Sequence, residues 1–245
     1  MAEISKYEKV FCALHDKGVL TWCPWVGEQY SKGGLLVVAE SNYAKDDKGN
    51  TPDAAVACVN GNRAFTKEVV DMFCLSRKKT NKTFDGVTYI LMQDDDDIVK
   101  KVSRSIWNSV AFMDVIQCAM KGIGWKEDKA LARNNIERPA RYLWKPGWEA
   151  LVSVVKVLEP SCMLFVGSSL AYMCNKAFLP KGVAAEIKKR QVVGKRLWLR
   201  TGWMKVEERN KVAIISIPNP GGAHGFSLDL WRKAVKDEMS KVHGK

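Results

Sequence analysis

Residues 33–43 read GGLLVVAESNY. The middle of this stretch, LLVVA at 35–39, is apolar without interruption, which is typical of a strand buried on both faces of a parallel sheet. A carboxylate, Glu40, follows directly, and behind it come Ser41, Asn42 and Tyr43. Ligands of such sheets bind beyond the carboxyl ends of the strands. The stretch therefore predicts a central strand that ends in a polar functional cluster.

Apolar runs of the same kind return along the chain and predict the rest of the sheet. We expect strands at 107–117, 163–167 and 212–217, a hairpin arm at 196–205, and a further strand at 84–92. Apolar residues at helical spacing predict amphipathic helices around 4–14, 148–158 and 227–242. Alternating strands and helices predict an α/β protein, a three-layer α/β/α sandwich with a central four-stranded parallel sheet, in one domain over residues 1–245.

Composition excludes several classes of protein. The chain has 245 residues and 47% hydrophobic content, too much for intrinsic disorder. No apolar stretch is long enough for a membrane span. The seven cysteines are scattered without a C-x-x-C motif, which argues against a zinc ribbon or a disulfide scaffold. The charged start, MAEISKYEKVF, has no signal-peptide pattern, so we expect a cytoplasmic protein with reduced thiols.

The charge of the chain is strongly basic and unevenly distributed. The formal net charge is +12, and residues 176–211 hold eleven lysines and arginines against three glutamates. This stretch includes Lys188, Lys189 and Arg190, with Trp198 and Trp203 interleaved. Such a balance favours a polyanionic partner, for which DNA is the first candidate. The alternative is a basic surface that only keeps the protein in solution.

Polar residues also mark the other expected strands. The second strand carries Asn108, and the third ends in Gly167-Ser168-Ser169. The fourth ends in IPNPGGAHGFS at 217–227, a glycine-rich loop with Asn219, Gly222, His224 and Phe226. If the strands are parallel, the groups that follow them share one edge of the sheet. We expect a single site built from these side chains.

In their order along the chain these blocks resemble the uracil-DNA glycosylase superfamily. GGLLVVAESNY resembles the first motif of prokaryotic members, behind PWVGEQY at 24–30. WNSVAF at 107–112 is similar to the second-strand block, EPSCMLFVG at 159–167 to the third, and IPNPGGAHGFS to the block with the family's His-Pro-Ser motif. The resemblance spans roughly residues 20–232. It implies a monofunctional DNA glycosylase that flips a base from double-stranded DNA and needs neither metal nor organic cofactor.

The resemblance also implies roles for individual residues. Glu40 would activate water or stabilise the sugar cation, with Asn42 sharing the water; alternatively Glu40 caps a turn or pairs with an arginine. Ser41 and Tyr43 would line the base pocket, although Tyr43 alternatively only packs in the core. Asn108 would read the base edge with its amide. Ser168, Gly222, Lys188, Lys189 and Arg190 would contact DNA.

The last block departs from the family. Ile217 stands where many members have the histidine that supports the leaving base. We expect Asn219 to take over that donor role, with His224 compensating from the loop unless it is only a surface residue. Phe226 would be the wedge in the emptied stack, or alternatively a hydrophobic staple before a cap at Ser227.

The changed motif shifts the expected substrate away from plain uracil. The prokaryotic members that the chain resembles include antiviral enzymes that remove sugar-modified hydroxymethylcytosine from phage DNA, and the glycine-rich loop would suit such a bulky base. The resemblance therefore implies a hypermodified pyrimidine, glucosylated hydroxymethylcytosine in phage DNA, as the expected substrate and an antiviral role for the protein. Uracil repair is the second hypothesis, and a non-catalytic DNA-binding module is the third. A serine hydrolase is disfavoured because Gly167-Ser168-Ser169 lacks the G-x-S-x-G elbow. No obligate protein partner is evident.

Overall fold

The computed structural model describes residues 2–41, 43–44, 57–92, 99–121, 141–174, 179–191, 198–221 and 226–243. Within them lies one mixed sheet, with the strand order β1-β4-β2-β6-β9-β8-β7. The strands in this order are β1 (Trp25–Val26), β4 (Ala111–Asp114), β2 (Leu35–Ala39), β6 (Cys162–Val166), β9 (Lys211–Ile217), β8 (Trp198–Val206) and β7 (Val183–Gln191). A separate parallel pair joins β3 (Tyr43–Ala44) to β5 (Met120–Lys121).

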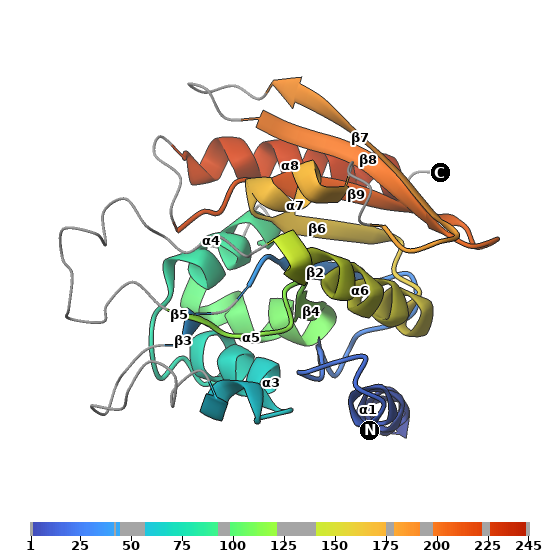
Figure 1. Ribbon diagram of the computed structural model, residues 1–245. Helices are drawn as coiled ribbons and strands as arrows, with labels where there is room; N and C mark the ends of the chain where they lie inside the picture. Colours follow the sequence, from blue (N-terminus) through green and yellow to red (C-terminus); the bar gives the residue numbers. More distant parts are fainter. Residues whose placement is uncertain are drawn as a thin grey trace.

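The centre of the sheet is the predicted set of four parallel strands, β4, β2, β6 and β9. The sheet is wider than predicted, because β1 pairs antiparallel with β4, and β8 and β7 extend the opposite edge as antiparallel strands. The predicted hairpin is confirmed as β8–β9. Figure 1 shows β7 and β8 as a long ribbon along one edge of the sheet.

Helices cover both faces of the sheet. Leu36, Val38 and Phe165 belong to the core under α1 (Ala2–Asp16), α6 (Trp144–Leu158) and α7 (Ser168–Cys174). Leu35, Val37 and Leu164 belong to the core under α3 (Phe65–Val70), α4 (Lys82–Leu91), α5 (Val99–Ser109) and α8 (Leu228–His243). Short helical turns of π and 3-10 type occupy Asp71–Leu75 and Arg141–Leu143. Because neighbouring residues of one strand face opposite cores, the strands are apolar without interruption.

Two predicted strands are wrong in type or in length. The segment 84–92 is helix α4, whose buried Phe84, Val87 and Ile90 follow helical spacing. Asn81 caps the helix, since its side chain accepts hydrogen bonds from two main-chain N–H groups of the first turn. The β-branched residues near its end favoured a strand prediction, but packing against the sheet decides the helix.

The second expected strand is much shorter than 107–117. Only Ala111–Asp114 is a strand, and residues 107–109 form the last turn of α5. Trp107 is fully buried there, and its indole N–H donates to the Thr88 hydroxyl at 2.9 Å. This contact with α4 fixes the end of α5, and the local sequence gives no sign of it.

Candidate functional site

The last residues of the four parallel strands lie side by side in one row. Ala39 lies beside Asp114 of β4 and beside Val166 of β6, and Val166 lies beside Ile217 of β9. Neighbouring strands are roughly 4.8 Å apart, so this row spans roughly 14 Å. The next residues along β2, β6 and β9 are Glu40, Gly167 and Pro218.

Glu40 is the half-buried carboxylate at the end of β2. Its main-chain carbonyl accepts a hydrogen bond from the Ile116 N–H at 2.8 Å, which ties the chain after β2 to the chain after β4. Its side chain lies near Gly167, where an added Cβ would be 3.8 Å from Glu40 Oε2. Gly167 has a φ of 134°, a conformation that favours glycine, and its N–H donates to the Ile217 carbonyl at 2.9 Å.

The carboxylate of Glu40 makes no ion pair or hydrogen bond with the residues that the structure describes. The alternatives of an arginine partner or a capped turn therefore find no support there. A half-buried carboxylate in this position is able to accept a proton from water or to stabilise a nearby positive charge.

Asp114 is the site residue that sequence reasoning missed. It is the last residue of β4, directly beside Ala39, and is only 1% exposed. Its main-chain carbonyl accepts from Gln117 Nε2 at 2.6 Å. The sequence feature that marks it is an acid at the end of the short apolar run AFMD, residues 111–114. Because the strand was predicted over 107–117, Asp114 was not recognised as a strand end. Asp114 also has an interaction within the protein, and its place at the carboxyl end of a parallel strand makes it a candidate for the site.

Ser41 follows Glu40 and presents a second unusual group. Its hydroxyl oxygen is buried and has no hydrogen-bond partner among the described residues. Buried hydroxyls normally have a partner, so this one favours a polar ligand at the end of β2. The predicted neighbours Asn42 and the side chain of Tyr43 lie outside the described residues.

Asn219 is held against α4. Its Oδ1 accepts two hydrogen bonds, from the Thr83 hydroxyl at 2.8 Å and from the Gly221 N–H at 2.8 Å. The next residue, Pro220, packs so close to Gly86 that a Cβ there would lie 2.4 Å from Pro220 Cβ. The chain after β9 is therefore docked on the first turns of α4. Thr83 was also missed, because it precedes the segment 84–92 that was predicted as a strand, and the start of α4 was not expected there. Gly222 and His224 lie outside the described residues.

The antiparallel pair of β7 and β8, called the basic ribbon here for its lysines and arginines, reaches the same end of the sheet. Arg200 of β8 lies beside Ser216 of β9, near the carboxyl end of that strand. Its Nη1 donates to the Ser168 carbonyl at 2.9 Å, which links β8 to the first residue of α7. Ser168 is exposed, as predicted for a DNA contact. The guanidinium and the serine hydroxyl together are suited to binding a phosphate.

The outer face of the ribbon carries further cations. Lys188 of β7 is exposed and forms an ion pair with Glu186 at 3.1 Å. A hydrogen bond from Lys188 holds the pKa of Glu186 below its ordinary value. The indole N–H of Trp203 donates to Glu186. On the same ring, Lys211 Nζ lies 3.9 Å from the centre. Lys189 and Arg190 belong to β7, but their side chains lie outside the described residues.

Asn108 is not part of this site, and its predicted position is wrong. It lies in the last turn of α5, before β4, and so at the amino end of the sheet. The length of β4, roughly 10 Å, separates it from the row of polar residues. Its carbonyl accepts from the Gln29 N–H at 2.8 Å, and a Cβ on Gly27 would lie 2.2 Å from that oxygen.

Phe226 is the hydrophobic staple rather than a free wedge. Its ring stacks on that of Trp231 with a centroid distance of 5.1 Å and an interplanar angle of 12°. Helix α8 begins at Leu228, so Phe226 and Trp231 occupy the two positions of a staple around Ser227. The Trp231 N–H donates to the Ser227 carbonyl at 3.1 Å, consistent with a helix start there.

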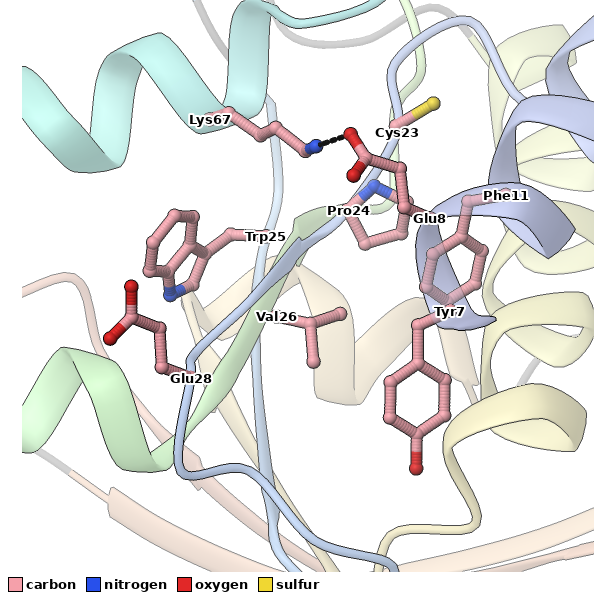
Figure 2. A pocket seen from close by; sticks show the side chains of 9 residues that line it. All are labelled: Tyr7, Glu8, Phe11, Cys23, Pro24, Trp25, Val26, Glu28 and Lys67. Carbon is pink, nitrogen blue, oxygen red and sulfur yellow. Dashed lines mark hydrogen bonds and ion pairs between the residues drawn. The ribbon is translucent and has the colours of Figure 1, made fainter. Parts of the chain in front are cut away.

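A pocket of about 150 Å³ lies elsewhere, between α1, α3 and the edge strand β1. Figure 2 shows Tyr7 and Phe11 on one side, Trp25 and Val26 on the other, and the ion pair between Lys67 and Glu8 across it. Strand β1 pairs with the first half of β4, at Ala111 and Phe112. None of the predicted site residues lines this pocket.

Comparison with known proteins gives no assignment: no family model and no curated protein sequence matches the chain. The described part of the chain contains no group of three histidine, cysteine or acidic residues placed to hold a metal ion. No helix found there has both the length and the apolar character needed to cross a membrane.

Proposed function

We propose that the protein is a monofunctional DNA glycosylase of the uracil-DNA glycosylase-like α/β/α type. One observation carries the proposal: Glu40, Asp114 and Asn219 lie at or just after the carboxyl ends of three parallel strands, and the two acids are half-buried and fully buried, respectively. This is the end at which such folds bind ligands. The motifs that resemble the superfamily supply Glu40 and Asn219, and the basic ribbon beside them suits a DNA substrate.

Hydrolysis of a base requires few protein groups. The C1′–N1 bond of the flipped nucleotide breaks, and its electron pair leaves with the base. Water adds to C1′ of the cationic sugar and gives up a proton, which Glu40 accepts or whose loss its charge assists. Asn219 Nδ2 donates to a carbonyl oxygen of the departing base, where negative charge develops. Metal and organic cofactors have no step to perform in this scheme.

Asp114 favours a cytosine-type base over uracil. A carboxylate is an acceptor at both oxygens, and the cytosine edge presents an exocyclic amino group as a donor. Uracil presents a carbonyl oxygen at that position, which a carboxylate would repel. The buried acid therefore supports the expected substrate, a hypermodified cytosine such as glucosylated hydroxymethylcytosine in phage DNA. Asp114 replaces Asn108 as the proposed base-reading residue.

Double-stranded DNA would lie across the strand ends and along the ribbon. Arg200 and Ser168 are joined by a hydrogen bond and are proposed to clamp a phosphate beside the flipped nucleotide. Lys188, Lys189 and Arg190 would follow the backbone further out. We propose a cytoplasmic enzyme that acts on DNA without an obligate protein partner.

The deciding experiment offers the protein three DNAs in parallel with EDTA present: uracil-containing, unmodified, and phage DNA with glucosylated hydroxymethylcytosine. Abasic sites are measured by alkaline cleavage. We expect them in the phage DNA alone. Abasic sites only in uracil DNA would make the protein a uracil-DNA glycosylase. Binding of all three without any base release would leave the non-catalytic DNA-binding module.

A further inference from the structure

The hydrogen bonds of Asn219 define which end of its amide is available to a ligand. A main-chain N–H is a donor only, so the atom that faces the Gly221 N–H at 2.8 Å has to be Oδ1. The Thr83 hydroxyl donates to the same oxygen from α4. Both donors lie on one side of the amide, which turns Nδ2 away from them. No described residue accepts a hydrogen bond from Nδ2.

Thr83 is well placed to hold this arrangement. It is the second residue of α4, and its own N–H is fixed at 2.9 Å from the Oδ1 of the capping residue Asn81. Gly221 packs on it closely: a Cβ on that glycine would lie 2.7 Å from Thr83 Oγ1 and 3.1 Å from Thr83 N. The turn at 219–221 therefore rests on Thr83 at two points, and both are on a rigid helix start.

We propose that Thr83 is a positioning residue that holds the Asn219 amide with Nδ2 directed to the departing base. This inference rests on the proposed glycosylase function, in which Asn219 stabilises the base anion. Ile217 stands where many members of the resembled superfamily have a histidine that supports the leaving base. A neutral amide donor then has to be oriented in advance, since its stabilising effect depends on a dipole that does not need to turn during the reaction.

The test compares Thr83→Val, which removes the hydroxyl at nearly constant shape, with Thr83→Ser, which keeps it. In single-turnover assays at saturating enzyme we expect T83V to lower the rate of base release about fivefold, the effect of one neutral hydrogen bond. T83S should stay within about twofold of the parent protein, and DNA affinity should change in neither. Equal rates for T83V and the parent protein would overturn the inference.

A double-mutant cycle separates positioning from a general structural effect. Asn219→Asp keeps an acceptor for Thr83 and Gly221 but removes the N–H donors. In that background T83V should cause no further loss of rate. Additive losses would show that Thr83 acts on folding or on another group, and would contradict the inference.

A measurement on the protein without DNA tests the positioning role of Thr83 separately from the proposed glycosylase activity. Nitrogen relaxation of the Asn219 side-chain amide should show restricted motion in the parent protein and in T83S, and increased motion in T83V. Unchanged motion in T83V would overturn the positioning role even if the enzyme is active. Restricted motion in a protein that releases no base from any DNA would instead refute the proposed function, and with it a role of Thr83 in catalysis.

Discussion

The two ends of the parallel strands use their charged residues differently. At the amino ends, cations are matched by acids: Glu159 pairs with Lys32 at 2.9 Å and with Arg209 at 3.5 Å, and Lys156 pairs with Glu207. At the carboxyl ends, Glu40 follows β2 and Asp114 ends the neighbouring strand β4. Arg200 donates a hydrogen bond to the Ser168 main-chain carbonyl. Among the described residues no carboxylate pairs with Arg200. Charges at the amino ends are paired with each other, whereas among the described residues Glu40 and Arg200 at the carboxyl ends form no ion pair.

Polar uncharged residues follow the same division. At the amino end the main chain around Asn108 is bonded to the segment before β2, and Gly27 leaves no space beside it. At the carboxyl end, among the described residues, the buried Ser41 hydroxyl has no hydrogen-bond partner and Asn219 Nδ2 has no acceptor. The difference shows that the direction of a strand decides at which end of the sheet a polar residue next to it lies, and therefore whether that residue is a candidate for the site.

The largest effect is expected at the carboxyl end, where catalysis is proposed. Glu40→Gln should lower single-turnover base release by roughly 10²- to 10⁴-fold, the usual contribution of a group that handles a proton or charge in the transition state. Asn108→Ala, at the other end of the sheet, should stay within about twofold of the parent rate. Thermal unfolding should confirm that both variants fold. Comparable losses in the two variants would remove the distinction between the ends.

The second prediction concerns base choice. Asp114→Asn replaces an acceptor-only group by an amide of the same size that also donates. We expect the ratio of rates on cytosine-type and uracil-type DNA to shift about tenfold or more toward uracil, because one base-edge contact is worth roughly 1–3 kcal/mol. Parallel single-turnover assays on the two DNAs measure this ratio. An unchanged ratio in a folded variant would assign base reading to another residue.

The sequence was sufficient for the parallel core and for the position of several candidate site residues at its strand ends. Uninterrupted apolar runs located β2, β6 and β9, and therefore Glu40, Ser168 and Asn219 at their ends. The failure at β4 had a physical cause: Trp107 is apolar and adjoins the strand, but its contact with Thr88 holds it in a helix. That error placed Asn108 at the wrong end and hid Asp114. Thr83 depends on a contact across 136 positions of the chain, which periodicity does not report.

A smaller effect is expected for DNA affinity. Arg200→Gln removes a proposed phosphate contact, so the slope of log affinity against log salt concentration should fall by about 0.9. Lys32→Gln removes an equal charge at the amino end, where Glu159 already pairs with it, and should leave the slope unchanged. Fluorescence anisotropy with labelled duplex over a range of salt measures both. Equal slopes for the parent protein and the Arg200 variant would remove Arg200 from the DNA interface.

The smallest effect belongs to the amino end and concerns stability alone. A hydrogen bond and the positive charge of Lys32 lower the pKa of Glu159, and those of Lys156 lower the pKa of Glu207. A carboxylate with a lowered pKa in the folded state binds protons more readily when unfolded. Its contribution to stability is therefore present above the ordinary glutamate pKa of 4.5 and is lost as the pH falls through the lower folded value.

Glu159→Gln tests this contribution. Because the pair is exposed, the variant should lower the melting temperature by no more than about 2 °C at neutral pH. The difference from the parent protein should shrink as the pH falls below 4.5, and also in high salt, which screens exposed charges. Base release at neutral pH should be unchanged, since Glu159 lies at the far end of the strands from Glu40. A loss of activity with unchanged stability would place chemistry at the amino end and contradict the division between the two ends.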